Sequence, residues 1–410
     1  MKIWSYPGIY PSPETGEPTA GIFIHKQNLA LKANGAEVNV IQTRDWFPVW
    51  PFYNLFPDWK RAKQSARPFS RKLDGISVYH PTVFSPKPSR LFNTPHGDLK
   101  IKAIVKFLQT QNVKKGKDVI MAQWLIPDGY HAVKVAKELG ISVAVEMQGD
   151  DIQVWPFQSE IHRAQALWVL ENADLILGCS DFLGKEAQKL YSKPLEVHTI
   201  YTGIDLQKFK PLATKKEKDE QRTKWGLKET DIVILNVGSS IARKGWNELF
   251  EAVSVLKSTY PTLKIVAATG GLSEFTLAEL AVKYGIENQL IDLGSVSNIE
   301  LPSLYQACDI FCLPSYWEGL ANVLCEAMSS GCAIVTTAVS GHPEVVIPAK
   351  NGELVTPRNV NELINALEKL ISSPELRQSY GIEARRMAEE KIKSHEDNAA
   401  KLYQLLKTII

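Results

Sequence analysis

The sequence predicts an α/β protein built from two doubly wound domains, each with a parallel sheet between layers of helices. Short apolar, β-branched runs alternate with amphipathic stretches along the chain, a pattern typical of parallel sheets covered on both faces. The alternation restarts near residue 230, after the polar stretch 213–223 (ATKKEKDEQRT). The chain has 410 residues, more than one core usually holds at roughly 150 residues per domain.

The elements of the first half follow from the hydrophobic pattern. Apolar runs predict strands at residues 37–42, 76–79, 119–123, 142–148 and 175–178. Amphipathic stretches predict helices at residues 26–34, 100–111, 129–139 and 159–172, because apolar positions recur there at helical spacing.

The second half repeats this pattern after a connection at residues 200–228. Strands are expected at residues 232–237, 264–268, 290–293, 310–313 and 333–337. Helices are expected at residues 245–257, 276–284, 299–307, 320–330 and 360–371, and residues 383–410 read as one long final helix.

Composition excludes several classes of protein. The hydrophobic fraction is 44% and the charged fraction 22%, which is ordinary for a globular chain and excludes a disordered, collagen-like or coiled-coil protein. The sequence has no run of 18 apolar residues, so no membrane span is expected. The first residues lack the apolar stretch of a secretory signal. The five cysteines, at 179, 308, 312, 325 and 332, lie in apolar segments and are expected to be reduced core residues of a cytoplasmic protein.

The charge is unevenly distributed. Residues 1–120 hold 18 Lys and Arg against 8 Asp and Glu, a net +10, whereas the remainder holds 29 against 37, a net −8. Such asymmetry suggests an anionic partner for the first domain, such as a membrane surface, a lipid phosphate or an acidic glycan. Charge that only keeps an exposed face soluble explains it equally well.

Residues 44–59 (RDWFPVWPFYNLFPDW) hold seven aromatic residues and three prolines. Proline disfavours a regular helix or a central strand, so a surface loop is expected. Its amphipathic aromatics suit an acceptor site or a membrane interface, and local packing of a long loop is the alternative.

The most informative junction follows the strand expected at residues 310–313. Its continuation, PSYWEGLANVLCEAMSSG, places Glu318 before a helix and Glu326 among apolar neighbours within it. In a doubly wound sheet, ligands bind at the carboxyl ends of strands, and unpaired N–H groups at a helix start suit phosphate or hydroxyl oxygens. A carboxylate in an apolar setting, such as Glu326, needs a hydrogen-bonding partner.

The motif P-S-x-x-E-G followed by E-A-M-x-x-G resembles retaining glycosyltransferase family 4, within the group 1 glycosyltransferases. Further matching segments are residues 21–31, 173–180, 200–209, 236–252, 304–338 and 342–355. The resemblance implies the GT-B fold, with two facing Rossmann-like domains and a C-terminal helix that crosses back to the first. We therefore expect an acceptor-side domain at residues 1–200 plus 388–410 and a nucleotide-sugar domain at residues 201–387.

The resemblance also implies roles for residues of the second domain. Glu318 matches the family residue that holds donor-sugar hydroxyls, Glu326 the one that holds the ribose, and Lys244 the phosphate-binding lysine. Where the family has an arginine after the loop glycine, this chain has Ser239, and Arg243 is the candidate second cation. A solvated basic turn is the alternative for Lys244 and Arg243. Further donor-side candidates are Gly238, Gly319, Leu320, Ala321, Asn322, Gly294, Ser295, Val296, His342 and Glu344.

The first domain supplies fewer matching positions. Gly21 matches a loop near the donor phosphate, with a turn glycine as the alternative. In the segment QGDD, Gly149 and Asp151 match the family's acceptor side, while Gln148 stands where relatives have histidine. Glutamine hydrogen-bonds sugar hydroxyls but does not act as a general base.

The resemblance implies a retaining, metal-independent glycosyltransferase of the hexosyltransferase type. We expect it to move a sugar from a nucleotide-diphosphate sugar to a glycan or lipid-linked acceptor in cell-envelope or exopolysaccharide biosynthesis, with no cofactor and no nucleic-acid partner. The expected location is the cytoplasm, with residues 44–72 as a possible contact to the inner face of the membrane. The alternatives are a GT-B sugar-nucleotide hydrolase or epimerase, and a non-catalytic membrane-associated partner protein.

Overall fold

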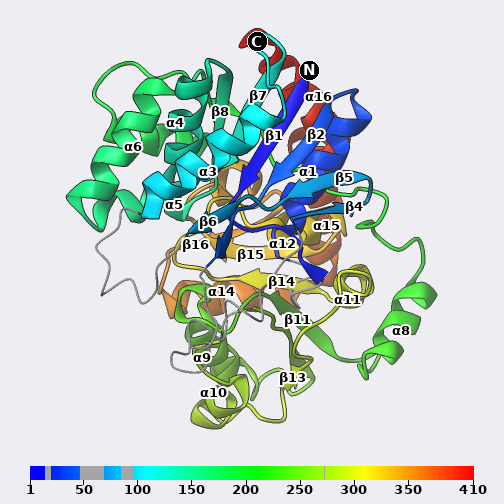
Figure 1. Cartoon of the computed structure of the whole chain (residues 1–410). Coiled ribbons are helices and arrows are strands. Elements are labelled where there is room, and N and C mark those ends of the chain that lie inside the picture. Colours follow the sequence, from blue (N-terminus) through cyan, green and yellow to red (C-terminus); the bar gives the residue numbers. More distant parts are fainter. Residues whose placement is uncertain (14–19, 47–68, 85–95, 272) are drawn as a thin grey trace, which may run out of the picture. The chain divides into compact units, whose positions relative to one another are not determined.

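The computed structural model describes all residues except 14–19, 47–68, 85–95 and 272 (Figure 1). The chain divides into two compact units, residues 1–202 with 395–410 and residues 203–394. Each unit holds a largely parallel sheet with helices on both faces, which confirms the predicted fold class. Among the described residues, no helix is long and apolar enough to cross a membrane.

The sheet of the first unit has eight strands in the order β10-β9-β8-β7-β1-β2-β5-β4. All neighbours are parallel except β4 and β5. The strands are β1 (Lys2–Pro7), β2 (Glu37–Ile41), β4 (Ser70–Leu73), β5 (Ile76–Tyr79), β7 (Asp118–Gln123), β8 (Ser142–Met147), β9 (Leu175–Gly178) and β10 (His198–Thr199), and β3 (Arg44–Trp46) pairs separately with β6 (Thr82–Phe84). Because β1 lies between β2 and β7, the chain reverses its direction of travel across the sheet at β1.

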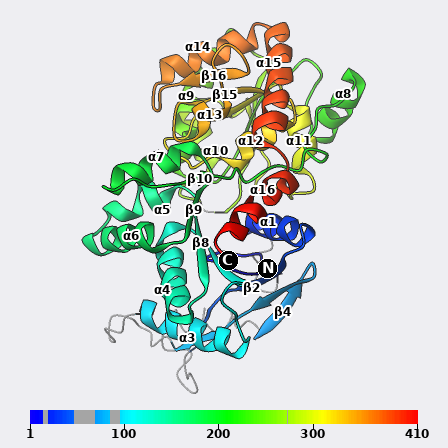
Figure 2. The ribbon, with the colours of Figure 1, turned by 90° about the horizontal axis from the view of Figure 1, so that it is seen from above.

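Alternate residues of the central strands enter two different cores. Ile3 packs with helices α1 (Ile22–Ala33) and α16 (His395–Thr408) on one face, and Figure 2 shows these two helices beside each other. Trp4 packs with the helices of the other face. Those helices are α3 (His96–Thr110), α4 (Tyr130–Leu139), α6 (Glu160–Asn172) and α7 (Asp181–Leu190), and the remaining ones are η2 (Leu125–Gly129), α5 (Asp150–Gln153) and η3 (Trp155–Phe157).

The second unit has a six-stranded sheet, all parallel, in the order β13-β12-β11-β14-β15-β16 (Figure 1). Its strands are β11 (Ile232–Val237), β12 (Leu263–Ala268), β13 (Leu290–Asp292), β14 (Ile310–Leu313), β15 (Ala333–Thr337) and β16 (Gly352–Val355). Its helices are α8 (Lys215–Lys224), η4 (Ala242–Lys244), α9 (Trp246–Leu256), α10 (Leu277–Tyr284), α11 (Leu301–Ala307), α12 (Asn322–Ser329), α13 (His342–Val345), α14 (Val360–Ile371), α15 (Pro374–Met387) and η5 (Ala388–Ile392). The direction of travel reverses between β11 and β14.

Three predictions about elements are wrong. The single helix expected at residues 383–410 is broken, because Lys393 has a left-handed φ of 64° and separates α15 and η5 from α16. The stretch 213–223, expected as a connection, contains helix α8, which begins with a capping box between Thr214 and Glu217. The helix expected at residues 320–330 begins only at Asn322. Most of the aromatic stretch 44–59 lies outside the described residues.

Gly381 tests the packing of α15 on the sheet of the second unit. A Cβ at this position would lie 2.2 Å from the carbonyl oxygen of Gly331. A side chain at residue 381 would therefore push the backbone of α15 away from the backbone at Gly331. We expect Gly381→Ala to destabilise the unit by about 1–3 kcal/mol through overpacking, despite alanine's better helix propensity.

Thermal unfolding measures this effect, since about 1 kcal/mol shifts the midpoint of a domain of this size by roughly 2–4 °C. Ser379→Ala, at an exposed position of the same helix, is the control and should change the midpoint little. An unchanged or higher midpoint for Gly381→Ala would show that this contact is not tight.

Candidate functional site

The candidate site of the second unit lies at the carboxyl ends of β11, β14 and β15. Three loops meet there, which carry Lys244, Glu318 and His342. Gly245 explains how the first two loops approach each other, because it has a φ of 72° and a Cβ on it would lie 2.1 Å from the carbonyl oxygen of Pro314. The Tyr316 N–H also donates to the carbonyl oxygen of Arg243 at 2.8 Å.

Glu318 is the centre of a buried charge cluster. Its Oε1 lies 2.6 Å from Lys244 Nζ and its Oε2 lies 3.1 Å from Arg243 Nη1. The hydroxyl of Ser315 donates to Oε1 at 2.9 Å. Only 8% of Glu318 and 9% of Lys244 are exposed. Burial by itself would raise the pKa of Glu318, but the charges of Lys244 and Arg243 outweigh it and lower this pKa to about 2.

The third loop is tied to the second by two hydrogen bonds. The Glu318 N–H donates to Ser340 Oγ at 3.2 Å, and the Gly341 N–H donates to the carbonyl oxygen of Gly319 at 2.9 Å. Glu344 lies at the end of this loop in α13, and its carbonyl oxygen accepts from Lys391 Nζ at 2.8 Å. Hydrogen bonds therefore link the three loops to one another around the charge cluster.

His342 is fully buried and uncharged at neutral pH. Its Nδ1 lies 2.9 Å from Thr336 Oγ1 and 3.3 Å from the carbonyl oxygen of Thr337. The Thr336 hydroxyl already donates to the carbonyl oxygen of Leu313, so Nδ1 carries the proton and Nε2 is the acceptor. Burial, with a smaller effect of Lys244, lowers the pKa of His342 to about 4, although Glu318 opposes this shift.

Glu326 has the partner that its apolar surroundings require. Tyr305 of α11 donates its hydroxyl to Glu326 Oε2 at 2.9 Å, and burial, followed by the charge of Glu326, raises the Tyr305 pKa. The sequence shows the need for a partner at Glu326 but not that Tyr305 supplies it. Because α12 begins at Asn322, the Gly319, Leu320 and Ala321 N–H groups belong to a loop and not to the first helical turn.

Several other candidate residues of this unit are engaged in holding loops. Ser239 Oγ donates to the carbonyl oxygen of Gly270 at 2.8 Å, and the Gly238 N–H donates to the carbonyl oxygen of Ala268 at 3.1 Å. Gly294 donates its N–H to Asp292 Oδ1 and accepts from the Thr269 N–H. Beyond Gly294 in this loop, the Ser295 side chain is exposed and Val296 is partly buried.

In the first unit, Asp151 has a structural role. Its carboxylate accepts from the backbone N–H groups of Leu125 at 2.6 Å, Gly149 at 2.7 Å and Gln148 at 3.0 Å, so it joins the loops after β7 and β8. Burial raises its pKa to about 6 against these hydrogen bonds. Gly21 has a φ of 65°, and a Cβ on it would lie 2.6 Å from the carbonyl oxygen of Ile9, so only glycine fits there.

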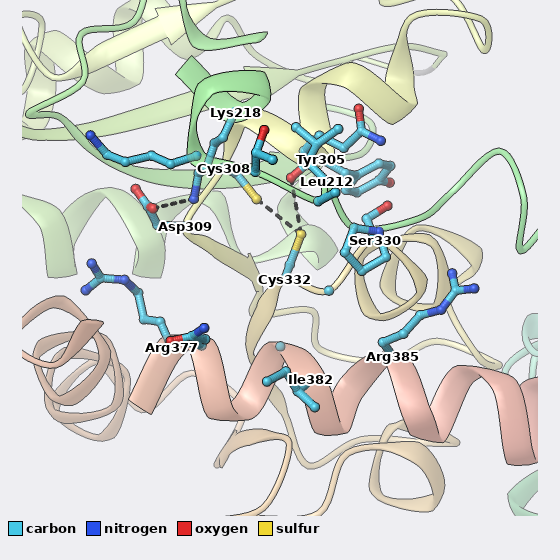
Figure 3. Close-up of a pocket in the computed structure, with 18 of the residues that line it drawn as sticks. Leu212, Lys218, Tyr305, Cys308, Asp309, Ser330, Cys332, Arg377, Ile382 and Arg385 are labelled. Carbon is cyan, nitrogen blue, oxygen red and sulfur yellow. Dashed lines mark hydrogen bonds and ion pairs between the residues drawn. The ribbon is translucent and has the colours of Figure 1, made fainter. Parts of the chain in front are cut away.

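A second hollow of the same unit as Glu318 lies at the opposite, amino ends of β14 and β15 (Figure 3). Its volume is about 710 Å³, and Cys308 Sγ lies 3.3 Å from Cys332 Sγ on its wall. Lys218 pairs with Asp309 at 2.8 Å, and Arg385 donates to backbone carbonyl oxygens. Since these cations hold the fold together, and the strand ends are the wrong ones, this hollow is not the candidate site.

Known proteins resemble this chain in sequence. Residues 217–387 match the family described as glycosyl transferases group 1. Over 361 residues the chain is 27% identical to a protein of Bacillus subtilis (strain 168) named as a teichuronic acid biosynthesis glycosyltransferase, TuaC, covering 86% of this chain and 87% of that protein. The chain spans about half the length of further curated relatives, also named as glycosyltransferases.

Solved structures resemble the chain over its whole length. A sucrose-phosphate synthase from Thermosynechococcus elongatus matches with a TM-score of 0.76 at 19% identity, covering 100% of this chain and 99% of that one. HepE from Anabaena, solved in complex with UDP-glucose, matches with a TM-score of 0.73 at 18% identity over 100% of both chains. At these identities the likeness shows the fold alone, and that fold is GT-B.

The charge cluster makes a prediction about pH. The folded-state pKa of Glu318 is about 2, below its ordinary value of 4.5, so its stabilising effect is complete above the ordinary value and is lost as the pH falls towards 2. Wild type should be more stable than Glu318→Gln at pH 7, and the difference should shrink at about pH 3.

Urea unfolding of both proteins across this pH range measures the difference. Glu287→Gln, at an exposed position, is the control and should show no comparable pH-dependent difference. A gap between wild type and Glu318→Gln that stays constant from neutral to acid pH would contradict the ion-paired state of Glu318.

Proposed function

Since this chain is a GT-B glycosyltransferase whose residues 217–387 match group 1, we propose that it is a retaining, metal-independent enzyme. Its donor is a nucleotide-diphosphate sugar, and its acceptor is a hydroxyl of a glycan or lipid-linked glycan. The observation that supports this most strongly is the cluster of Lys244, Arg243 and Glu318 at the ligand-binding ends of parallel strands.

Lys244 and Arg243 bind the diphosphate in this proposal. Two cations and one carboxylate leave the cluster with a net charge of +1. An ammonium group has three donors, so Lys244 can keep its hydrogen bond to Glu318 and still donate to phosphate oxygens. These fixed cations stabilise the charge that grows on the leaving diphosphate, which makes a metal ion unnecessary.

Glu318 and Glu326 position the donor as hydrogen-bond acceptors. With a pKa of about 2, Glu318 is ionised at neutral pH and accepts hydroxyl donors of the sugar, so it is not a general acid. Glu326 accepts from the ribose hydroxyls, and the Tyr305 hydroxyl fixes its orientation. Ser295 and Val296 remain the candidate contacts for the base, and His342 Nε2 is a further candidate acceptor.

Retention follows from attack on the face that the diphosphate leaves. The bond between the sugar C1 and the diphosphate oxygen breaks, the acceptor oxygen bonds to C1 on the same face, and its proton passes to the departing diphosphate. Glu318 is a poor nucleophile for the alternative double displacement, because both of its oxygens are engaged by cations. This route needs no enzyme base, which is consistent with Gln148 on the acceptor side.

The variants Lys244→Ala and Glu326→Ala test this assignment. We expect Lys244→Ala to lower the rate of donor hydrolysis or transfer by roughly 10²–10³, since it removes a charge contact to the leaving group. Glu326→Ala should mainly raise the KM for the donor. The assay uses UDP-glucose and a panel of other nucleotide sugars, with products identified by mass spectrometry.

Lys350→Ala and Glu287→Ala, both at exposed positions, serve as controls and should keep wild-type rates. Circular dichroism should confirm that the variants fold. Wild-type rates in both Lys244→Ala and Glu326→Ala would exclude the assignment. Nucleotide release without any transfer, across many acceptors, would instead favour a sugar-nucleotide hydrolase.

A lipid-linked acceptor at a membrane is the second part of the proposal. It rests on the net charge of +10 over residues 1–120 and places the enzyme at the inner face of the membrane in envelope or exopolysaccharide assembly. Lys60, Arg61, Lys63 and Arg67 lie outside the described residues. Arg71 donates to the carbonyl oxygen of Pro11, so it also has a structural role, whereas Lys72 is exposed.

Sedimentation with phosphatidylglycerol vesicles tests this part. Binding should be strong at low salt and should weaken several-fold at high salt, because exposed charges are screened. Replacing Lys60, Lys63 and Lys72 by Gln should weaken it further, with neutral phosphatidylcholine vesicles as the control. Binding that ignores both salt and these substitutions would contradict a membrane role for the basic segment.

A further inference from the structure

A small polar pocket in the first unit lies at the carboxyl ends of β1 and β2. Its volume is about 160 Å³. Its polar lining comes from four separate elements or loops, with Tyr6 and Tyr10 at the end of β1 and beyond it, Gln42 after β2, Lys100 from α3 and Asp128 from η2. None of the candidate residues predicted from the sequence lines it.

The position of the pocket is the one that the topology favours for a ligand. The chain continues from β1 to β2 on one side and returns to β7 on the other, so the loops after β1 and β7 diverge. A crevice opens at such a switch point in doubly wound sheets. Gly8, in the loop after β1, and Asp128, in the loop after β7, lie together at this switch point.

Asp128 is a buried carboxyl group that packs closely against the backbone of Gly8. It is 7% exposed, and its Oδ2 would lie 2.7 Å from a Cβ on Gly8, so only glycine leaves room for it. Burial raises its pKa to about 7, although the charge of Lys100 and a hydrogen bond from the Gly8 N–H oppose this shift. Near neutral pH such a group can both accept from and donate to a hydroxyl.

Gln42 provides an independent sign of a ligand. It is 7% exposed, and among the described residues its Oε1 is buried without a hydrogen-bond partner. A buried acceptor without a partner costs roughly 1–3 kcal/mol. The Gln42 oxygen therefore requires a donor, and the Asp128 carboxyl group and Lys100 line the same pocket as further polar groups.

We infer that this pocket binds a hydroxyl-bearing sugar ring of the acceptor, with Asp128 and Gln42 accepting from its hydroxyls and Lys100 donating to a ring substituent. The assignment rests on the proposed function and names a subsite for its acceptor. A sugar hydroxyl is donor and acceptor at once, which matches the mixed lining. An apolar ligand would leave the Gln42 oxygen without a partner and would desolvate the Asp128 carboxyl group further.

Sugar binding to the full chain tests the subsite. The probes are the methyl glycosides of glucose, galactose, mannose, N-acetylglucosamine and glucuronic acid. Their binding is measured by saturation-transfer NMR in the presence of excess UDP. At least one glycoside should bind the wild type. Asp128→Asn, Gln42→Leu and Gly8→Ala should each weaken that binding roughly tenfold, the equivalent of one hydrogen bond of about 1.4 kcal/mol.

Asp98→Asn and Lys102→Gln are matched controls, because both residues lie on exposed positions of α3 near Lys100, and both should bind like wild type. Gly8→Ala and Gln42→Leu keep the test decisive if Asp128→Asn does not fold. The subsite is excluded if no glycoside binds wild type, or if the three pocket variants bind as wild type does.

The same variants separate this inference from the proposed function. Donor hydrolysis with water should remain near the wild-type rate in the pocket variants, while the KM for the glycoside rises. If the pocket variants lose glycoside binding but the chain binds and cleaves no nucleotide sugar, the subsite stands and the donor function fails. If donor cleavage is intact and the glycoside KM is unchanged, the subsite fails alone.

Discussion

The ionised Glu318 carboxylate, 2.6 Å from Lys244 and 3.1 Å from Arg243, is the interaction on which the candidate site depends. A buried carboxylate is tolerated only with charged or hydrogen-bonding partners, so the loop after β14 must stay against the turn that carries both cations. Backbone hydrogen bonds then fix the loop after β15 to the same place. One buried charge thus organises three loops and still leaves a net positive charge, which the proposed function assigns to binding a diphosphate.

Both units use the same topological device with different chemistry. In the second unit, the reversal between β11 and β14 brings cations and carboxylates together at the place where, in the proposed function, the nucleotide sugar binds. In the first unit, the reversal at β1 places the Asp128 carboxyl group and the Gln42 amide beside one lysine. This division is what a transfer between a charged donor and a hydroxylated acceptor requires.

Much of the fold could be predicted because its central strands are buried on both faces and are continuous apolar runs. Residues 232–237, 310–313 and 333–337 are strands with the expected bounds. The breaks were harder to predict, since the left-handed Lys393 interrupts an unbroken helical pattern. The hydrophobic pattern does not predict helix α8, because its residues are almost all charged or polar. Its capping box, Thr214 with Glu217, is the one helix signal in the sequence there. The pairing of Tyr305 with Glu326 and the pocket around Asp128 join residues far apart in sequence, so the sequence pattern predicts neither.

In the proposed function, Lys244, Arg243 and Glu326 bind the nucleoside diphosphate of the donor. A crystal structure of the chain with UDP measures this most directly. We expect the terminal phosphate within about 3 Å of Lys244 Nζ, as in a charge-assisted hydrogen bond, and the ribose hydroxyls on Glu326. A nucleotide bound elsewhere, for instance in the hollow beside Cys308 and Cys332 or on the first unit alone, would contradict it.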